Sequence, residues 1–191
     1  MKHQVIVIEK PSEISWDVIH KILLAAHSDK NKDGGAQVTA YLTGDELKEK
    51  VGDGKCFVAL MDGKLVGTAS VTIREQNFWY HKGKIAYYGF GAILPEYQGF
   101  GIYSKLDAAR DEYVKNSGID AIYTHTSFRN KKMQEIKRKQ GYRLVNFFAS
   151  TKTDYYSVTL AKWIGNWPFP AWYCLFRFYL KKIYIRVRVR R

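Results

Sequence analysis

The chain has 191 residues, of which 46% are hydrophobic and 26% are charged, and its formal net charge is +13. This composition is typical of one globular domain and excludes a disordered chain. The two cysteines, Cys56 and Cys174, are too few for a disulfide framework or a zinc site, so we expect buried thiols in a reducing compartment and no metal. The positive charge favours anionic partners such as phosphates, nucleic acid or an anionic membrane.

The N-terminal residues do not have the pattern of an export signal. Their apolar run at 5–8 is about half the usual length of such a signal and ends at Glu9. No stretch reaches the roughly 18 apolar residues of a membrane-spanning helix. We therefore expect a cytoplasmic protein.

Seven runs rich in β-branched and aromatic residues, bounded by turn residues, predict strands. They lie at 5–8, 56–61, 65–74, 85–94, 121–127, 142–150 and 155–163. Asp62-Gly63, between the second and third runs, is a strong hairpin signal. The polar segments 28–37 and 76–84 predict connections.

Capping residues and apolar stripes predict four helices between these strands. One opens at Pro11-Ser12, one follows the capping box at Thr43, one spans 100–116, and one runs from Asn130 to Gly141. The order of elements predicts a mixed α/β or α+β layer fold.

A composition break separates the domain 1–163 from a basic aromatic extension, 164–191. The extension holds seven of the 31 basic residues, eight aromatic residues and no acidic residue. Residues 171–180 suit a helix in a membrane interface, whereas 183–190 alternate apolar residues mainly with Arg, which predicts a strand or an extended arm. The extension could dock on its own sheet, bind an anionic membrane, or bind nucleic acid or another protein. The core lacks a nucleic-acid reader motif, which makes nucleic acid the least favoured partner.

The segment 94–103 reads Leu-Pro-Glu-Tyr-Gln-Gly-Phe-Gly-Ile-Tyr and joins a predicted strand to a predicted helix. Glycine lets a backbone approach a ligand, and the helix start offers unpaired N–H groups that suit a pyrophosphate. A tight turn without a ligand would have the same pattern. The segment lacks the Lys-Ser/Thr end of a Walker loop, and Gly89-Phe90-Gly91 lacks the third glycine of a dinucleotide fingerprint.

This segment resembles the acyl-CoA-binding signature of the GNAT superfamily of N-acetyltransferases, Gln/Arg-x-x-Gly-x-Gly/Ala. Gln98 and Gly101 match the signature, and Tyr103 stands where the family prefers Gly or Ala. The order of elements over residues 3–163 also fits the family.

A second motif, which starts at Asn130 and closes in Gly141-Tyr142, resembles the family's Asn-led helix. The resemblance implies the GNAT-like acyl-CoA N-acyltransferase fold. It also implies acetyl transfer from acetyl-CoA to an amine of a small molecule or sugar.

The resemblance further implies where acetyl-CoA binds. The pyrophosphate would lie on backbone amides of the turn, and the pantetheine arm would pair with the preceding strand and lie beside Asn130. The implied residues are Ala92, Ile93, Leu94, Gln98, Gly99, Phe100, Gly101, Ile102, Tyr103 and Asn130.

An amine acceptor must lose a proton before it attacks the thioester, because its pKa is near 10.4. His125 is a candidate base, since its strand faces the expected cleft and an unperturbed histidine has a pKa of about 6.5. Tyr87 and Tyr88 are further catalytic candidates, and they occupy opposite faces of one strand. Each of the three also has a purely structural interpretation as a packed or hydrogen-bonded side chain.

Other interpretations stay open at this stage. The family often places a Tyr acid at the position of Lys137, so that role is not carried over. Glu75, His81 and Tyr123 are weaker candidates for the base, and the segments 28–43 and 76–84 would form the acceptor site if the family layout holds. The missing Tyr and the bulky Tyr103 also fit a non-catalytic module that binds CoA, or acts on a membrane or nucleic acid through its basic tail. If the tail binds a membrane, the acceptor would lie at its inner face.

Overall fold

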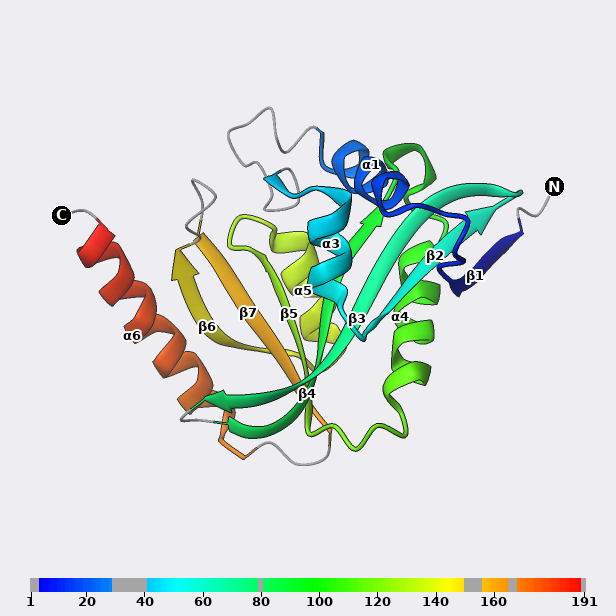
Figure 1. Cartoon of the computed structure of the whole chain (residues 1–191). Coiled ribbons are helices and arrows are strands. Elements are labelled where there is room, and N and C mark those ends of the chain that lie inside the picture. The colour runs from blue at the N-terminus through cyan, green and yellow to red at the C-terminus, as the bar shows by residue number, and fades with distance from the viewer. Residues whose placement is uncertain (1–3, 29–40, 79–80, 150–155, 165–167, 190–191) are drawn as a thin grey trace. The chain divides into compact units, whose positions relative to one another are not determined.

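The computed structural model describes residues 4–28, 41–78, 81–149, 156–164 and 168–189 (Figure 1). Contacts group the chain into two compact units, Met1–Ile73 with Tyr88–Gly118, and Arg74–Tyr87 with Ile119–Arg191. Seven strands form one sheet in the order β1-β2-β3-β4-β5-β7-β6. The expected mixed α/β fold is therefore confirmed.

The first unit contains antiparallel strands joined by a tight hairpin. β1 (Val5–Glu9) pairs with β2 (Lys55–Met61), which pairs with β3 (Lys64–Phe78). Asp62 and Gly63 both have positive φ angles, 51° and 79°, as a two-residue hairpin turn of type I′ requires. The hairpin predicted from Asp-Gly is confirmed.

Helices of the first unit pack on alternating residues of β2. Cys56 and Val58 join a buried cluster with α1 (Trp16–Ala26) and α3 (Gly44–Val51). Ala59 and Met61 join a second cluster with α4 (Ile102–Val114). Because successive side chains of a strand point to opposite faces, one strand supports both cores.

The first helix starts later than expected. Ser15 is the N-cap of α1, and its hydroxyl accepts a hydrogen bond from the Val18 N–H at 3.3 Å. Residues 12–14 form a turn that Lys10 closes, since its Nζ donates to the carbonyl oxygens of Pro11 and Ile14. The prediction that Pro11-Ser12 opens the helix is wrong, because the second of two nearby serines takes the capping conformation.

The second unit is built around three antiparallel strands. β7 (Tyr156–Trp163) lies between β5 (Ala121–Ser127) and β6 (Arg143–Ala149). α5 (Lys131–Lys139) connects β5 to β6. The first residues of β4 (His81–Ile93) join this unit through two 2.8 Å hydrogen bonds between Lys84 and Asp120.

The basic extension forms one helix, α6 (Ala171–Val189), which runs beside β6 (Figure 1). The inner side of α6 buries Cys174 and Phe178, and the ring of Phe178 meets the ring of Phe147 edge-on at 5.7 Å. The prediction of a strand or an extended arm at 183–190 is therefore wrong for residues 183–189, which are helical. No Gly or Pro interrupts the segment, so the helix continues past the residues whose period of two suggested a strand.

Two other expectations concern connections. The segment 76–84 is mostly strand, since β3 extends to Phe78 and β4 starts at His81. Polar residues continue a strand when one of its faces is solvated, so polarity alone mispredicted a loop here. The connection expected at 28–37 lies outside the described residues, apart from Ser28. Both cysteines are buried free thiols, as expected.

Candidate functional site

The segment between β4 and α4 forms an open turn in the first unit. A short 3₁₀ helix, η2 (Pro95–Tyr97), follows β4, and its C-cap Gln98 donates from N–H to the Pro95 carbonyl oxygen at 3.2 Å. Gly99 and Gly101 then have φ angles of 91° and 71°, a region that favours glycine. The two glycines thus reverse the chain into the start of α4.

The N-terminus of α4 is suited to an anion. Its N-cap, Gly101, has no capping side chain, and its first turn has no acidic residue. Its first intrahelical hydrogen bond runs from Lys105 N–H to the Gly101 carbonyl oxygen at 3.3 Å, so amides before Lys105 have no acceptor within the helix. A β-carbon placed on Gly99 or Gly101 would meet no atom within 4 Å, so the space beside this backbone is open. Backbone amides and the helix dipole favour negative charge in such a position.

The strand before the turn is locally strained. Phe90 has a φ of 46°, a region that bulky residues rarely adopt. Ala92 and Ile93 are buried in the two cores of this unit. The Leu94 N–H donates to the Val66 carbonyl oxygen at 2.9 Å, so β3 already occupies that donor. Pairing of a pantetheine arm here would depend on Ala92 and Ile93.

Tyr103 packs back against β4. Its ring lies on Gly91, where a β-carbon would come within 3.1 Å of Cε2. The Arg110 guanidinium lies 5.8 Å from the centre of the same ring. The glycine therefore makes room for the bulky side chain that departs from the family preference.

Arg110 organises a buried polar cluster that the sequence did not reveal. It is 1% exposed and forms an ion pair with Asp107. Its Nη1 donates to the carbonyl oxygens of Ser70 at 3.3 Å and Gly89 at 3.5 Å. Burial alone would lower the pKa of Arg110, but interactions with Tyr103 and Asp107 raise it above its usual value.

Tyr88, a predicted catalytic candidate, belongs to this cluster. Its hydroxyl donates to Asp111 at 2.6 Å, and its ring lies 4.4 Å from the Arg110 guanidinium. The side chain is 2% exposed. These contacts give Tyr88 a structural role that links β4 to α4.

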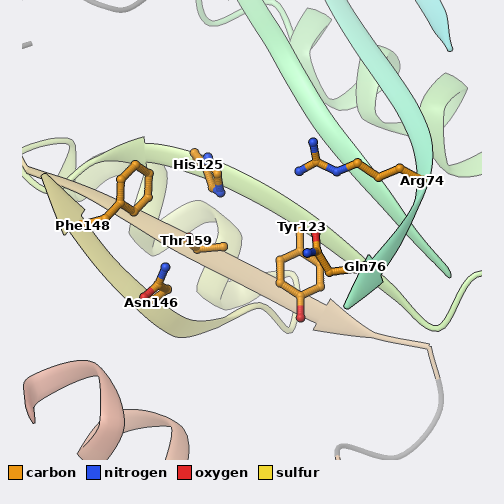
Figure 2. A pocket seen from close by; sticks show the side chains of 7 residues that line it. All are labelled: Arg74, Gln76, Tyr123, His125, Asn146, Phe148 and Thr159. Atoms are coloured by element: carbon orange, nitrogen blue, oxygen red, sulfur yellow. The ribbon is translucent and has the colours of Figure 1, made fainter. Parts of the chain in front are cut away.

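The second unit contains a pocket of about 200 Å³ formed by β3, β5, β6 and β7 (Figure 2). Its lining is polar and aromatic: Arg74, Gln76, Tyr123, His125, Asn146, Phe148 and Thr159. Tyr123 and His125 were sequence candidates for the base, and Gln76 begins the segment 76–84 that was expected at the acceptor site. The spacing of Tyr123 and His125 by two residues on a strand was the available signal, since it places both side chains on one face.

His125 is held among aromatic rings in this pocket. Its ring meets Tyr87 at 5.1 Å and Phe148 at 5.0 Å, both edge-on. Part of the side chain is exposed to solvent, but desolvation by the surrounding groups, together with the charge of Arg74, lowers the pKa of His125 to about 4. The imidazole is therefore neutral at pH 7 and a weaker base than an ordinary histidine. Burial raises the pKa of Tyr87, against the effect of Arg74, whose guanidinium lies 4.8 Å from the ring centre.

The remaining candidates lie elsewhere. Asn130 is the N-cap of α5, and its Oδ1 accepts from the Met133 N–H at 3.2 Å. Lys137 is buried, with Nζ 5.0 Å from the Tyr142 ring centre. Glu75 is exposed between the two pocket residues of β3, and the side chain of His81 lies outside the described part of the chain, as does most of 28–43.

The predicted cofactor residues are thus divided between the units: 92–103 belong to the first and Asn130 to the second. Within the described residues, no three side chains of His, Cys, Asp or Glu gather closely enough to bind a metal ion. No described helix combines the length and apolar character needed to cross a membrane.

Comparison with known proteins identifies relatives by family and by fold. The model of the acetyltransferase (GNAT) family matches residues 16–142. No curated protein sequence gives a significant match.

Three solved structures illustrate the shared fold. A GNAT acetyltransferase from Streptococcus pneumoniae has a TM-score of 0.60 at 17% identity, covering 85% of this chain and 100% of its own. One from Elizabethkingia anophelis with acetyl-CoA bound has a TM-score of 0.58 at 11% identity, covering 84% and 98%. FeeM, an N-acyl amino acid synthase from uncultured soil microbes, has a TM-score of 0.65 at 14% identity, covering 87% and 93%.

Proposed function

Because this chain belongs to the GNAT family of acetyl-CoA-dependent acyltransferases, we propose that it acetylates an amine of a small molecule or sugar. The main observation that supports this proposal is the open turn before α4, where Gly99 and Gly101 have positive φ and the helix has no side-chain cap. A pyrophosphate is the ligand that such a turn favours.

The turn would bind acetyl-CoA through backbone groups. The amides of 99–103 lie at the helix start, whereas the Gln98 N–H is already used by Pro95. The first turn of α4 has no acidic residue that would repel an anion, and the positions of Gly99 and Gly101 have no β-carbon that would block it. Each helix-terminus interaction contributes only about 0.3–1 kcal/mol at an exposed site, so several amides must act together. The backbone of β4 at Ala92 and Ile93, whose side chains are buried, would guide the pantetheine arm, and Asn130 is the further residue that the resemblance implies for that arm.

We assign the role of general base to His125. A protonated amine has a pKa near 10.4 and cannot attack until it loses a proton. At a pKa of about 4 the imidazole of His125 is a weak base, so it would accept that proton, directly or through water, when a bound anion beside Arg74 raises its pKa toward the usual value. The amine nitrogen then attacks the thioester carbon, the C–N bond forms, the C–S bond breaks, and the CoA thiolate leaves and takes up a proton. Tyr87 would position the imidazole through its ring contact.

The test of the turn is calorimetric titration with acetyl-CoA. Gly101→Val places a branched side chain at a φ of 71° in the open space of the turn, and Gly63→Val is a matched control at a φ of 79° in the β2–β3 hairpin. Each substitution strains its backbone by about 1–3 kcal/mol. We expect binding to weaken at least tenfold in Gly101→Val and to persist in Gly63→Val. Equal binding by all three proteins would contradict the proposal.

A second observation favours work at a membrane surface. The outward face of α6 carries six large apolar side chains, each at least half exposed: Trp172, Phe176, Tyr179, Leu180, Ile183 and Val187. At 3.6 residues per turn these positions form one stripe, opposite the buried Cys174 and Phe178. The stripe, which we call the outer face of α6, is unlike the usual charged surface of a helix.

The helix that carries the outer face is also strongly basic, and Arg186 lies next to that face. Lys181, Lys182, Arg186 and Arg188 lie on α6, and the segment 164–191 has no acidic residue. An apolar stripe flanked by Lys and Arg is the pattern of a helix that lies in a membrane interface, where each cation near an anionic surface adds about 1 kcal/mol. We therefore propose that α6 binds the inner face of an anionic membrane, and that the acceptor is met there.

Vesicle sedimentation tests the membrane proposal. The double variant Phe176→Ser/Ile183→Ser removes two outer-face side chains, and Val18→Ser removes an exposed apolar side chain of α1 as the control. We expect wild type and control to sediment with phosphatidylcholine–phosphatidylglycerol vesicles and the double variant to lose at least tenfold in affinity. Sedimentation of all three proteins alike would refute it. Binding to a DNA duplex but not to vesicles would favour nucleic acid instead.

A further inference from the structure

The pocket of the second unit carries a positive charge that the described structure does not neutralise. Figure 2 shows Arg74 extending from β3 toward the strand that carries His125. Among the described residues, no carboxylate lies within ion-pair distance of Arg74, and its guanidinium lies 4.8 Å from the centre of the Tyr87 ring. The other lining side chains are neutral at pH 7.

The lining also offers hydrogen bonds and apolar contact. Gln76 and Asn146 have amide groups, and Thr159 has a hydroxyl, so three polar side chains can bind a ligand beside the guanidinium. Phe148 and Tyr123 supply aromatic surface. A volume of about 200 Å³ fits a group of several heavy atoms rather than a whole cofactor.

These features select an anionic group. A guanidinium binds carboxylate or phosphate through two parallel hydrogen bonds, and such charge-assisted bonds are about twice as strong as neutral ones. The cation–π contact with Tyr87 favours one orientation of the exposed Arg74 side chain, which reduces the entropy lost on binding. A positively charged acceptor end would be repelled by the same side chain.

We propose that this pocket binds the anionic end of the acceptor, a carboxylate or a phosphate, through Arg74. That the bound molecule is an acceptor rests on the proposed acetyl transfer. The anion site itself depends only on the residues of the pocket. It narrows the acceptor to amines that also carry a negative charge, such as an amino acid or a phosphorylated amino sugar.

Binding of an anion would also act on His125. Arg74 is the second cause, after burial, of the low pKa of His125. An anion paired with Arg74 cancels part of that positive potential and raises the pKa of His125 toward its usual value. The titratable and charged groups around the imidazole are Arg74 from β3, Tyr87 from β4 and Tyr123 from its own strand.

The experiment follows the imidazole signals of His125 by NMR in the full chain without acetyl-CoA. The probes are N-acetylglycine, its neutral counterpart N-acetylglycinamide, and methyl phosphate. Arg74→Gln removes the cation, and Arg129→Gln removes an exposed cation that does not line the pocket.

We expect one or both anions to shift the His125 signals and raise its pKa in wild type and Arg129→Gln, with at least tenfold weaker binding of the neutral amide. Arg74→Gln should lose that preference. The carboxylate and phosphate arms tell which anion binds. Equal binding of charged and neutral probes, no binding of any, or an undiminished preference in Arg74→Gln would overturn the proposal.

This readout separates the anion site from the proposed enzyme function. Gly101→Val should lose acetyl-CoA while its His125 signals still respond to the anions. Anion binding without acetylation of any amine would leave the pocket in place and refute the transferase role. Acetylation of an amine without anion binding would support the transferase role and refute the anion site.

Discussion

The ring of Tyr103 lies so close to Gly91 that a β-carbon at position 91 would be 3.1 Å from Cε2 and 3.3 Å from the hydroxyl oxygen. The bulky residue of the turn is therefore accommodated by a missing side chain on β4. Tyr103 stands where GNAT signatures prefer Gly or Ala, and its contact with Gly91 explains how this chain accepts the departure while its turn keeps an open backbone.

A double-mutant cycle tests this pairing. Gly91→Ala crowds the Tyr103 ring, and overpacking typically costs about 1–3 kcal/mol. In a Tyr103→Ala background the same change should stabilise the protein by about 0.5–1 kcal/mol, because glycine within a strand is less favourable than alanine. Urea unfolding of the four proteins measures the coupling. A Gly91→Ala effect of the same sign in both backgrounds would show that the contact is unimportant.

Local signals predicted much of this fold. Asp62-Gly63 placed a hairpin, Thr43 placed a capping box, and the apolar run at 121–127 matches β5 residue for residue. These features depend on a few neighbouring residues, so the sequence contains them directly.

Predictions that depend on distant contacts were less successful. The alternation at 183–189 suggests a strand, but these residues continue a helix whose inner side packs on Phe147 of β6. The turn at 98–103 was predicted because its two glycines, Gly99 and Gly101, are close together in the sequence. The pocket around His125 was mostly missed, because Arg74, Asn146 and Thr159 come from three strands that only the sheet brings together.

The buried ion pair of α4 should be sensitive to the loss of one partner. Asp107→Ala leaves the Arg110 guanidinium buried with carbonyl oxygens and the Tyr103 side chain but without its carboxylate, and breaking such a pair costs about 3–5 kcal/mol. Asp107→Ala/Arg110→Met should recover part of this loss, because it removes the uncompensated charge. The exposed pair of Glu112 and Lys115 is the control, and Glu112→Ala should change the free energy of unfolding by less than about 1 kcal/mol. A small effect of Asp107→Ala would show that the pair is solvated.

Asn130 has one observed role and one proposed role, which a substitution can separate. Asn130→Ala removes the cap of α5 and should cost about 1 kcal/mol. Asn130→Ser keeps a capping oxygen and should restore most of this stability. If Asn130 also binds the pantetheine arm, both variants should raise the KM for acetyl-CoA while kcat stays similar. An unchanged KM in Asn130→Ser would leave capping as its sole function.

The charge state of His125 gives the protein a predictable response to pH. Its pKa is lowered to about 4, first by burial and then by Arg74, whereas the unfolded chain binds the proton below about 6.5. The contribution of neutral His125 to stability is therefore lost as the pH falls from about 6.5 toward 4. His125→Gln should flatten the pH dependence of unfolding in this window, and Arg74→Gln should raise the pKa of His125 in an NMR titration. A wild-type pKa near 6.5 would contradict both expectations.

The same substitution should destabilise the protein strongly on the inner side of α6 and hardly at all on its outer face. Phe178 is 2% exposed and packs on Phe147, so Phe178→Ala should destabilise the protein by about 3–5 kcal/mol. Phe176 is 55% exposed on the outer face, so Phe176→Ala should change stability by less than about 0.5 kcal/mol. Thermal and urea unfolding of the isolated protein measure both. If Phe176→Ala proved as costly as Phe178→Ala, the outer face would be covered by protein in solution, and the membrane surface proposed for α6 would lose its basis.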